Sequence, residues 1–464
     1  TRINMINVTS FANKPVGVLG LGRSGLSVVR ALAAGEAEVW AWDDLEATRD
    51  KAIDEGIELT DLYQSDWSQL DTLVLSPGIP DQFPEPHEIA SRARNAGCEI
   101  ICDVDLLARE AATARFVGVS GTNGKSTTTA LIGHILKAEE RSVEIGGNYG
   151  IPVLDLTPLG EDGTYVLELS SYQLERVPSV RLDVAVLLNI SPDHLDRHGG
   201  LDGYVGAKRI LFERTKENAQ TIIGMEDSHC RGISLELMID RGGKGIVPIS
   251  GSARTPGGVY VENGTLIDDL ENQQKSIMDL RTVTTLPGGH NWQNAAAAYA
   301  AARAADIKPE KIAAAIQTFD GLPHRQELIR EIKGVAYIND SKATNTEAAA
   351  RALLCYQDVH WIAGGQFKEK DLGAIAQVLP KIKHAYLLGE AQDQLAGLLG
   401  SNVSARQFNN LEAAVNAAHQ AAQREGGGAV LLSPACASFD QFADFEQRGD
   451  TFRDLVKNLE AGAG

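Results

Sequence analysis

The stretch that decides the fold is FVGVSGTNGKS, residues 116–126. Its first five residues predict a short buried strand, and the residues after Ser126 predict a helix. A glycine loop between a strand and a helix turns backbone N–H groups toward phosphate oxygens, and the helix N-terminus adds a partial positive charge. Lys125 can reach the β- and γ-phosphates of a nucleotide, and the Ser126 hydroxyl can bind Mg²⁺. The stretch therefore predicts a phosphate-binding loop inside an α/β domain.

This loop departs from the strict phosphate-loop pattern in one position. The strict pattern has a glycine five residues before Gly124, where this chain has Val119. The alternative interpretation is a glycine-rich turn that only begins a helix. A strand directly before the loop and a helix directly after it favour phosphate binding.

A second glycine loop, GLGRSG at residues 20–25, lies nearer the N-terminus. It follows a predicted strand at 16–19 and opens a helix near 26–34, and the next predicted strand, 38–42, ends at Asp43. That spacing fits a dinucleotide site for NAD, the diphosphate of another nucleotide, or close strand–helix packing without a ligand. The residues alone leave these three interpretations open.

Acidic and imidazole side chains follow the two strands predicted after the phosphate loop, at 165–169 and 184–188. They are Glu168, Asp193, His194, Asp196 and His198. Such ligands at neighbouring strand ends can converge on a Mg²⁺ that bridges ATP phosphates. His194 and His198 are also four residues apart, as two zinc ligands on a helix would be, and either aspartate could instead cap a helix.

The length of 464 residues predicts several domains, and strands alternate with helices along all of it. A further strand at 72–75 ends at Ser76, and the stretch 242–279 predicts irregular strands and loops. Beyond Gly321-Leu322-Pro323, further strands are predicted at 335–338, 359–363, 385–388 and 430–432. We therefore expect an α/β protein with three domains, at residues 1–111, 112–321 and 322–464.

Composition excludes several classes of partner. The chain has 43 Lys and Arg against 62 Asp and Glu, a net charge of −19, which argues against a nucleic-acid partner. No apolar run reaches the length of a transmembrane helix, so we expect no membrane partner. The five cysteines form no CxxC pair, which argues against a disulfide scaffold and fits a cytoplasmic location.

Taken together, the motifs resemble those of the Mur ligases, and the resemblance covers nearly the whole chain. Those that carry it are Gly121-Thr122-Asn123-Gly124-Lys125-Ser126, Glu168-Leu169-Ser170-Ser171, Asp193-His194-Leu195-Asp196, Ala207-Lys208, Gly289-His290-Asn291 with Asn294, and Gly321-Leu322-Pro323-His324-Arg325. In the third segment, the residues 339–345 (NDSKATN) and 431–440 (LLSPACASFD) resemble the D-glutamate-adding branch of that family.

The resemblance implies an N-terminal Rossmann-like domain for the UDP end of the substrate, a central ATPase of the P-loop type with a mixed sheet, and a C-terminal Rossmann-like domain for the amino acid. The first glycine loop would then bind a uridine nucleotide, not NAD. The implied contacts to the UDP-linked substrate are Gly22, Arg23, Ser24, Asp43, Ser76, Asn148 and Ser170.

The resemblance also implies ATP and Mg²⁺. The matching ATP positions are Gly121, Thr122, Asn123, Gly124, Lys125, Ser126, Thr127, Asn291, Asn294, Arg325, Asp340 and Lys342. The matching metal positions are Ser126, Glu168, His194 and Lys208, and the matching catalytic positions are Lys125, Glu168, His194 and Lys208. By residue type alone, Lys208 is a solvated helix lysine; only the resemblance implies that CO₂ converts it to a carbamate that binds Mg²⁺.

For the acceptor, the matching positions are Thr344, Lys368, Ser438 and Phe445. The implied reaction joins D-glutamate to UDP-N-acetylmuramoyl-L-alanine through an acyl phosphate made from ATP, by a monomeric enzyme. An NAD-dependent dehydrogenase would account only for residues 20–25. A nucleotide-binding regulator would account for residues 121–126 but not for the acceptor motifs.

Overall fold

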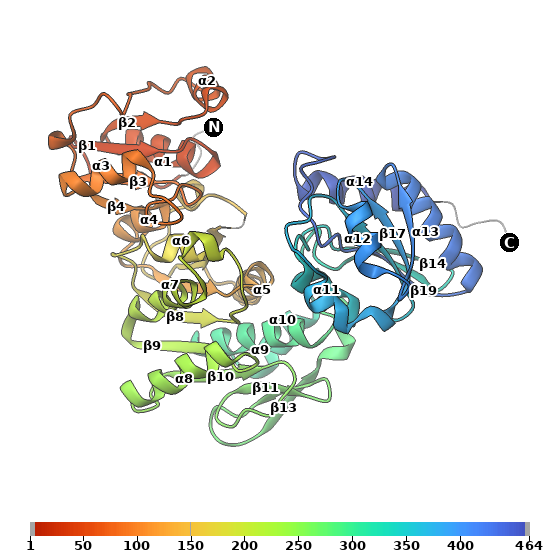
Figure 1. Cartoon of the computed structure of the whole chain (residues 1–464). Helices are drawn as coiled ribbons and strands as arrows, with labels where there is room; N and C mark the ends of the chain where they lie inside the picture. The colour runs from red at the N-terminus through yellow and green to blue at the C-terminus, as the bar shows by residue number, and fades with distance from the viewer. Residues whose placement is uncertain (1–4, 149, 460–464) are drawn as a thin grey trace. The chain divides into compact units, whose positions relative to one another are not determined.

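The computed structural model describes residues 5–148 and 150–459. In this part of the chain the strands form three sheets, each built from a separate stretch of sequence (Figure 1). Within the same part, no helix is both long and apolar enough to cross a membrane.

The first sheet has the order β2-β1-β3-β4 and its strands run parallel. Its strands are β1 (Pro15–Leu19), β2 (Glu38–Trp42), β3 (Thr72–Leu75) and β4 (Glu99–Ile101), and its helices are α1 (Arg23–Ala34), α2 (Glu46–Asp54), α3 (Glu88–Ala96) and α4 (Asp103–Glu110). The central strands β1 and β3 are almost wholly buried, which is why they read as continuous apolar runs.

The second sheet has the order β13-β12-β11-β10-β9-β8-β5-β7-β6. It is parallel from β6 to β11 and antiparallel at β12 and β13, so it is mixed. Its strands are β5 (Arg115–Ser120), β6 (Val143–Gly147), β7 (Thr164–Glu168), β8 (Leu182–Leu187), β9 (Thr215–Gly224), β10 (Ile246–Ser250), β11 (Val259–Glu262), β12 (Thr265–Asp268) and β13 (Lys275–Asp279). The helices of this part are α5 (Lys125–Ala138), α6 (Ser171–Leu174), α7 (Leu201–Glu213), α8 (Ser228–Asp240), α9 (Gly289–Ala304) and α10 (Pro309–Gln317).

The third sheet has the order β14-β15-β19-β16-β17-β18, with only β14 antiparallel. Its strands are β14 (Glu327–Ile332), β15 (Val335–Asn339), β16 (Val359–Gly364), β17 (Ile382–Leu388), β18 (Ser404–Phe408) and β19 (Gly428–Leu432). The helices are α11 (Thr346–Leu354), α12 (Gln392–Leu399), α13 (Leu411–Glu425) and α14 (Phe445–Asn458). One apolar core joins the sheet to α11 and α12, and another joins it to α13 and α14, so helices cover both faces.

Two compact units contain these sheets. Unit 1 holds the first two sheets and ends at Asp279, apart from Gln293–Gln317, which returns to it. Unit 2 consists of Leu280–Trp292 and the chain from Thr318 onward, and it holds the third sheet. The predicted fold class is confirmed, while the domain boundaries after residues 111 and 321 stay predictions.

Candidate active site

The loop between β5 and α5 has the backbone that phosphate binding requires. Gly124 has φ +88°, and a Cβ atom there would lie 2.4 Å from Asn294 Oδ1. Both the left-handed backbone and the close side chain therefore require glycine at this position. Because α5 begins at the next residue, its unpaired first N–H groups and the positive end of its dipole lie at this loop.

Three predicted residues meet beside this loop at the carboxyl ends of the strands. Ser126 Oγ donates a hydrogen bond to Glu168 Oε2 at 2.5 Å, and Asn148 Nδ2 donates to Glu168 Oε1 at 3.0 Å. Glu168 is buried, being 3% exposed. Lys125 Nζ donates to the carbonyl oxygens of Gly121 and Thr122, at 2.9 and 2.8 Å. The structure thus gathers cationic, hydroxyl and carboxylate groups around the predicted phosphate loop.

Lys208 lies on α7 and is buried, not solvated as its residue type alone suggests. It is 1% exposed, and its Nζ donates to Ser120 Oγ at 3.2 Å and to the Gly121 carbonyl oxygen at 2.9 Å. Burial, followed by the positive charge of Lys125, holds the pKa of this amine well below its ordinary value. A lowered pKa favours the neutral form of this amine, which is the nucleophilic form.

His194 adopts the left-handed conformation, with φ +51°, and a 3₁₀ turn at Leu195–Arg197 follows it. His194 and His198 are therefore not on one α-helix, as paired zinc ligands would be. His198 is buried and bonds the Ser171 hydroxyl at 2.9 Å. Among residues 5–148 and 150–459, no group of three His, Cys, Asp or Glu side chains could hold a metal ion.

The two aspartates of this segment, Asp193 and Asp196, do not cap a helix either. His194 stands at the N-cap of the 3₁₀ turn, and Gly200 stands at the N-cap of α7, both without a side-chain cap bond. The cap interpretation was therefore wrong for both aspartates.

One residue that shapes the phosphate loop, Asn189, was not predicted from the sequence. Its Oδ1 accepts the Asn123 N–H at 2.9 Å and its Nδ2 donates to the Asn123 carbonyl oxygen at 3.0 Å. Its own carbonyl oxygen accepts the Thr122 N–H at 2.9 Å. The only signal in the sequence was a polar residue just after the strand β8.

The first glycine loop is held by its own neighbours. Asp43 accepts the Leu21 N–H at 2.7 Å and the Leu45 N–H at 2.9 Å, and Ser76 Oγ donates to the Gly20 carbonyl oxygen at 3.0 Å. Gly25 is required because a Cβ there would lie 1.8 Å from that carbonyl oxygen. Asp43 and Ser76 thus shape the loop whatever its ligand.

Four more predicted substrate residues lie in or beside the elements that follow the strands β1 and β7. Gly22 precedes α1 and Ser24 is in its first turn, while Arg23 donates to the Gly150 carbonyl oxygen at 2.6 Å. Ser170 caps α6, where its hydroxyl accepts the Gln173 N–H at 3.2 Å.

Two arginines of the central segment bind the loop that follows β3. Arg176, 2% exposed, donates to the carbonyl oxygens of Ser76 and Ile79, at 3.1 and 2.8 Å, and pairs with Asp81 at 3.0 Å. Arg197 donates to the Gly78 carbonyl oxygen at 2.7 Å. These bonds join the first sheet to the second within unit 1.

The remaining predicted nucleotide residues belong to unit 2, except Asn294, which belongs to unit 1. Asn291 Nδ2 donates to the Pro287 carbonyl oxygen at 2.9 Å. Asp340 is buried and accepts from Ser433 Oγ at 2.8 Å and from the Gln326 N–H at 3.1 Å. Burial raises the pKa of Asp340 to about 7.

The predicted acceptor residues lie on three loops and one helix end of unit 2. The loops with Lys368 and Ser438 are joined by two backbone hydrogen bonds between Gln366 and Ala437, at 2.9 and 3.1 Å. Lys342 Nζ lies 3.9 Å from the ring centroid of Phe445, which begins α14. Lys368 is exposed, Thr344 and Phe445 are half-buried, and Ser438 is buried.

Comparison with known proteins shows the family of this chain. Residues 119–302 match the Mur ligase middle domain, and residues 324–436 match the domain described as Mur ligase, glutamate ligase domain. The chain belongs to the Mur ligase family. It is an ATP-dependent ligase that forms amide bonds.

Full-length relatives carry a more specific name. A UDP-N-acetylmuramoylalanine--D-glutamate ligase of Rhodospirillum rubrum is 49% identical over 98% of this chain and 97% of its own. The ligase of the same name from Caulobacter vibrioides is 46% identical over 99% of both chains. The phosphate loop, the Glu168 cluster and the acceptor loops all lie within the span that these relatives share.

Solved structures share the fold at low sequence identity. MurC of Thermotoga maritima has a TM-score of 0.59 at 17% identity, covering 96% of this chain and all of its own. The ADP complex of MurF from the same organism has a TM-score of 0.54 at 19% identity, covering 85% of this chain and 100% of that one.

Proposed function

We propose that the chain joins D-glutamate to UDP-N-acetylmuramoyl-L-alanine, at the expense of ATP, in peptidoglycan precursor synthesis. The observation that carries this proposal is the cluster of Ser126, Glu168 and Asn148 beside the phosphate loop, in a chain 49% identical to a ligase of that name over 98% of its length. The acceptor motifs of unit 2 support the same amino acid.

The chemistry follows from the inertness of a carboxylate toward an amine at neutral pH. The L-alanine carboxylate oxygen attacks the γ-phosphorus of ATP, ADP leaves, and an acyl phosphate forms. The D-glutamate amine then attacks the acyl carbon, and phosphate leaves as the amide forms and the amine loses a proton. Phosphoryl transfer depends mainly on positioning and charge neutralisation, which the loop N–H groups and Lys125 supply.

The residues beside the loop fit Mg²⁺. The Ser126 hydroxyl and the Glu168 carboxylate are oxygen ligands, as this hard cation prefers, and they are already within 2.5 Å of each other. We assign both to the metal, together with His194 and a carbamylated Lys208. Bound Mg²⁺ neutralises phosphate charge.

We assign carbamylation to Lys208 because its amine is buried and its pKa is lowered. A neutral amine attacks CO₂, and loss of one proton leaves an anionic carbamate. The carbamate places a negative charge next to the positive charge of Lys125, and the two attract each other.

The remaining assignments follow the motifs. The UDP-linked substrate is bound by the first glycine loop with Asp43 and Ser76, and by Asn148 and Ser170. ATP is bound by residues 121–127 with Asn291, Asn294, Arg325, Asp340 and Lys342, and D-glutamate by Thr344, Lys368, Ser438 and Phe445. We also propose a cytoplasmic location, because ATP is a substrate and all five cysteines are free thiols in the structure; the monomeric state stays a prediction.

The test is phosphate release from ATP with Mg²⁺ and UDP-N-acetylmuramoyl-L-alanine, comparing D-glutamate, L-glutamate, a diamino acid and no acceptor. We expect release that depends on D-glutamate and a product heavier by one glutamate residue. The variant Lys125→Ala should abolish release while remaining folded. Release with only a diamino acid would assign a different acceptor, and no release with any acceptor would refute the ligase.

A second test addresses the carbamate. Lys208→Ala should lose ligase activity and recover part of it when short carboxylic acids are added, because they can replace the missing carboxylate. Lys216→Ala is the matched control, since Lys216 forms only a half-exposed ion pair with Asp183 at 2.9 Å. Full activity of Lys208→Ala without added acid would exclude the carbamate.

A further inference from the structure

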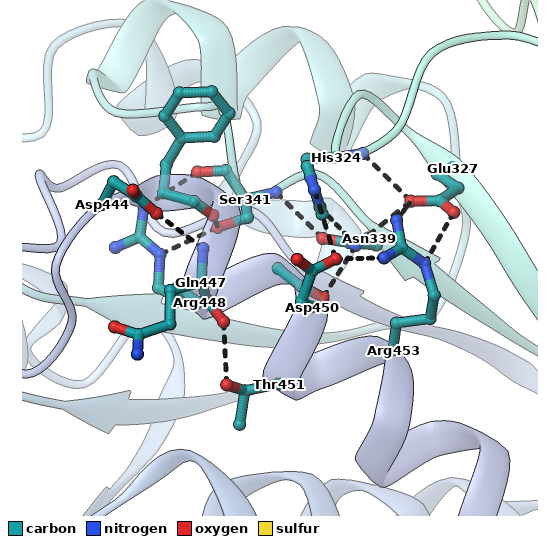
Figure 2. Close-up of polar contacts among 12 residues, drawn as sticks. His324, Glu327, Asn339, Ser341, Asp444, Gln447, Arg448, Asp450, Thr451 and Arg453 are labelled. Atoms are coloured by element: carbon teal, nitrogen blue, oxygen red, sulfur yellow. Dashed lines mark hydrogen bonds and ion pairs between the residues drawn. The ribbon is translucent and has the colours of Figure 1, made fainter. Parts of the chain in front are cut away.

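Unit 2 contains a buried arginine, Arg448 on α14, whose guanidinium contacts three separate loops. Its Nε donates to Ser341 Oγ at 3.0 Å, and its Nη2 donates to the Ser341 carbonyl oxygen at 2.8 Å. Nη1 and Nη2 donate to the Cys436 carbonyl oxygen at 3.1 and 3.2 Å, and Nη1 reaches the Gly364 carbonyl oxygen at 3.5 Å. Figure 2 shows the guanidinium beside Ser341.

Each of these contacts lies a few residues from a proposed acceptor residue. Ser341 is three residues before Thr344, Gly364 is four before Lys368, and Cys436 is two before Ser438. Ser341 Oγ also donates to the Phe445 carbonyl oxygen at 2.8 Å, which connects the fourth acceptor residue to the same network. The Arg448 side chain thus bonds three of the four segments, and Ser341 bonds the fourth.

The partners of Arg448 are neutral. The side chain is 1% exposed, and in the described part of unit 2 its hydrogen bonds go to three carbonyl oxygens and one hydroxyl. Burial lowers the pKa of this guanidinium to about 10, against the opposing influence of Cys436 and Asp440. Burying a cation without a paired carboxylate costs free energy of folding. Only the planar, fixed set of N–H donors of a guanidinium can hydrogen-bond to three segments at once.

We propose that Arg448 is a positioning residue for the acceptor amino acid, because its guanidinium sets the spacing among the loops that bind D-glutamate. The inference rests on the proposed function and adds to it a residue that does not itself contact the substrate. Its positive charge beneath those loops also favours an acceptor of net negative charge.

The experiment compares Arg448→Ala and Arg448→Lys with the wild type in steady-state kinetics. We expect the KM for D-glutamate to rise by about 10²-fold in Arg448→Ala, because displaced loops misplace the acceptor, while the KM values for ATP and the UDP-linked substrate change little. Arg448→Lys keeps the charge but not the fork, so it should recover only part of the loss. Added guanidinium at low millimolar concentration should restore part of the activity of Arg448→Ala.

Arg424→Ala on the exposed side of α13 is the matched control and should match the wild type. Equal changes in all three KM values, or an unchanged KM for D-glutamate in both Arg448 variants, would overturn the proposal. If Arg448→Ala does not fold, Arg448→Lys alone decides it by the same comparison. Absence of D-glutamate-dependent turnover in the wild type would instead refute the proposed function.

Discussion

Gly124 shows how a single backbone conformation supports nucleotide binding. An alanine there must adopt φ near +88°, at a cost of about 1–2 kcal/mol, and its Cβ would collide with Asn294 Oδ1. We expect Gly124→Ala to weaken ATP binding by at least about tenfold, measured by titration calorimetry. The control is Gly232→Ala in the exposed part of α8, where a Cβ meets nothing within 4 Å. Equal ATP affinity in the two variants would contradict this expectation.

Asp340 should make stability depend on pH. Its pKa is about 7 in the folded chain against an ordinary 3.8, so between these values the folded state binds more protons than the unfolded state. The contribution to the free energy of unfolding is complete below pH 3.8 and is lost as the pH rises toward 7, by at most about 1.4 kcal/mol per pH unit. Asp340→Asn removes that slope.

The measurement is urea unfolding of the wild type and of Asp340→Asn at several pH values. The free energy of unfolding of the wild type minus that of Asp340→Asn should fall steadily from pH 4 to pH 7. A difference that is constant or rises over this range would show that folding does not raise the pKa of the Asp340 carboxyl group.

Sequence patterns identified the residues of the candidate site that belong to motifs. They did not identify residues that belong to no motif. Lys125 and Ser126 directly follow a glycine loop, and that spacing has a physical reason because it lets Lys125 reach phosphates and Ser126 bind Mg²⁺. Asn189 and Arg448 belong to none of these motifs, and only the fold shows which loops they contact. The residue type of Lys208 predicted a solvated side chain, and this was wrong because helix lysines usually face solvent whereas Lys208 is buried.

Among the elements, α11 connects the acceptor motif to the third sheet. Its N-cap is Asn345, whose Oδ1 accepts the Ala348 N–H at 2.8 Å. Asn410 caps α13 in the same way at 2.9 Å, away from the acceptor motif in the sequence. We expect Asn345→Ala and Asn410→Ala each to lower the free energy of unfolding by about 1 kcal/mol.

Only Asn345→Ala should also raise the KM for D-glutamate, because Asn345 follows Thr344 directly. Thermal unfolding and steady-state kinetics on both variants provide the comparison. A rise in KM of the same size in Asn410→Ala would mean that general loosening of unit 2, not the position of α11, governs acceptor binding.

Several buried strands of the three sheets were predicted within a few residues, because strands covered on both faces are continuous apolar runs. This applies to β1, β5, β8 and β16. The edge strands β14 and β18 were not predicted, since ELIREI and SARQF carry exposed polar side chains and owe their conformation to pairing with a neighbour. The strand β9 begins with TKENAQ, in which every residue except Ala219 is polar, and it was missed for the same reason.

At the scale of the whole molecule, unit 1 unites two sheets that each carry a glycine loop. Arg176 joins them through bonds to the loop after β3. We expect Arg176→Lys to raise the KM for the UDP-linked substrate severalfold and to leave the KM for ATP nearly unchanged, because one ammonium cannot replace a fork that serves three acceptors.

Arg30→Ala is the comparison variant. Arg30 on α1 lies 3.6 Å from Asp155 and also pairs with Glu55, but its side chain is 45% exposed, so the loss should be small. Equal effects in Arg30→Ala and Arg176→Lys would show that any bond across unit 1 has the same importance.

The two arginines that join the sheets of unit 1, Arg176 and Arg197, have a consequence for selectivity. In the proposed function the uridine end of the substrate lies at the first glycine loop and the reacting carboxylate lies near Glu168. The bonds from Arg176 and Arg197 to residues 76–81 fix the separation of these two places. A fixed separation selects substrates by length. The protein can therefore reject a molecule that has the right chemical groups at the wrong distance from each other, without contacting the part that differs.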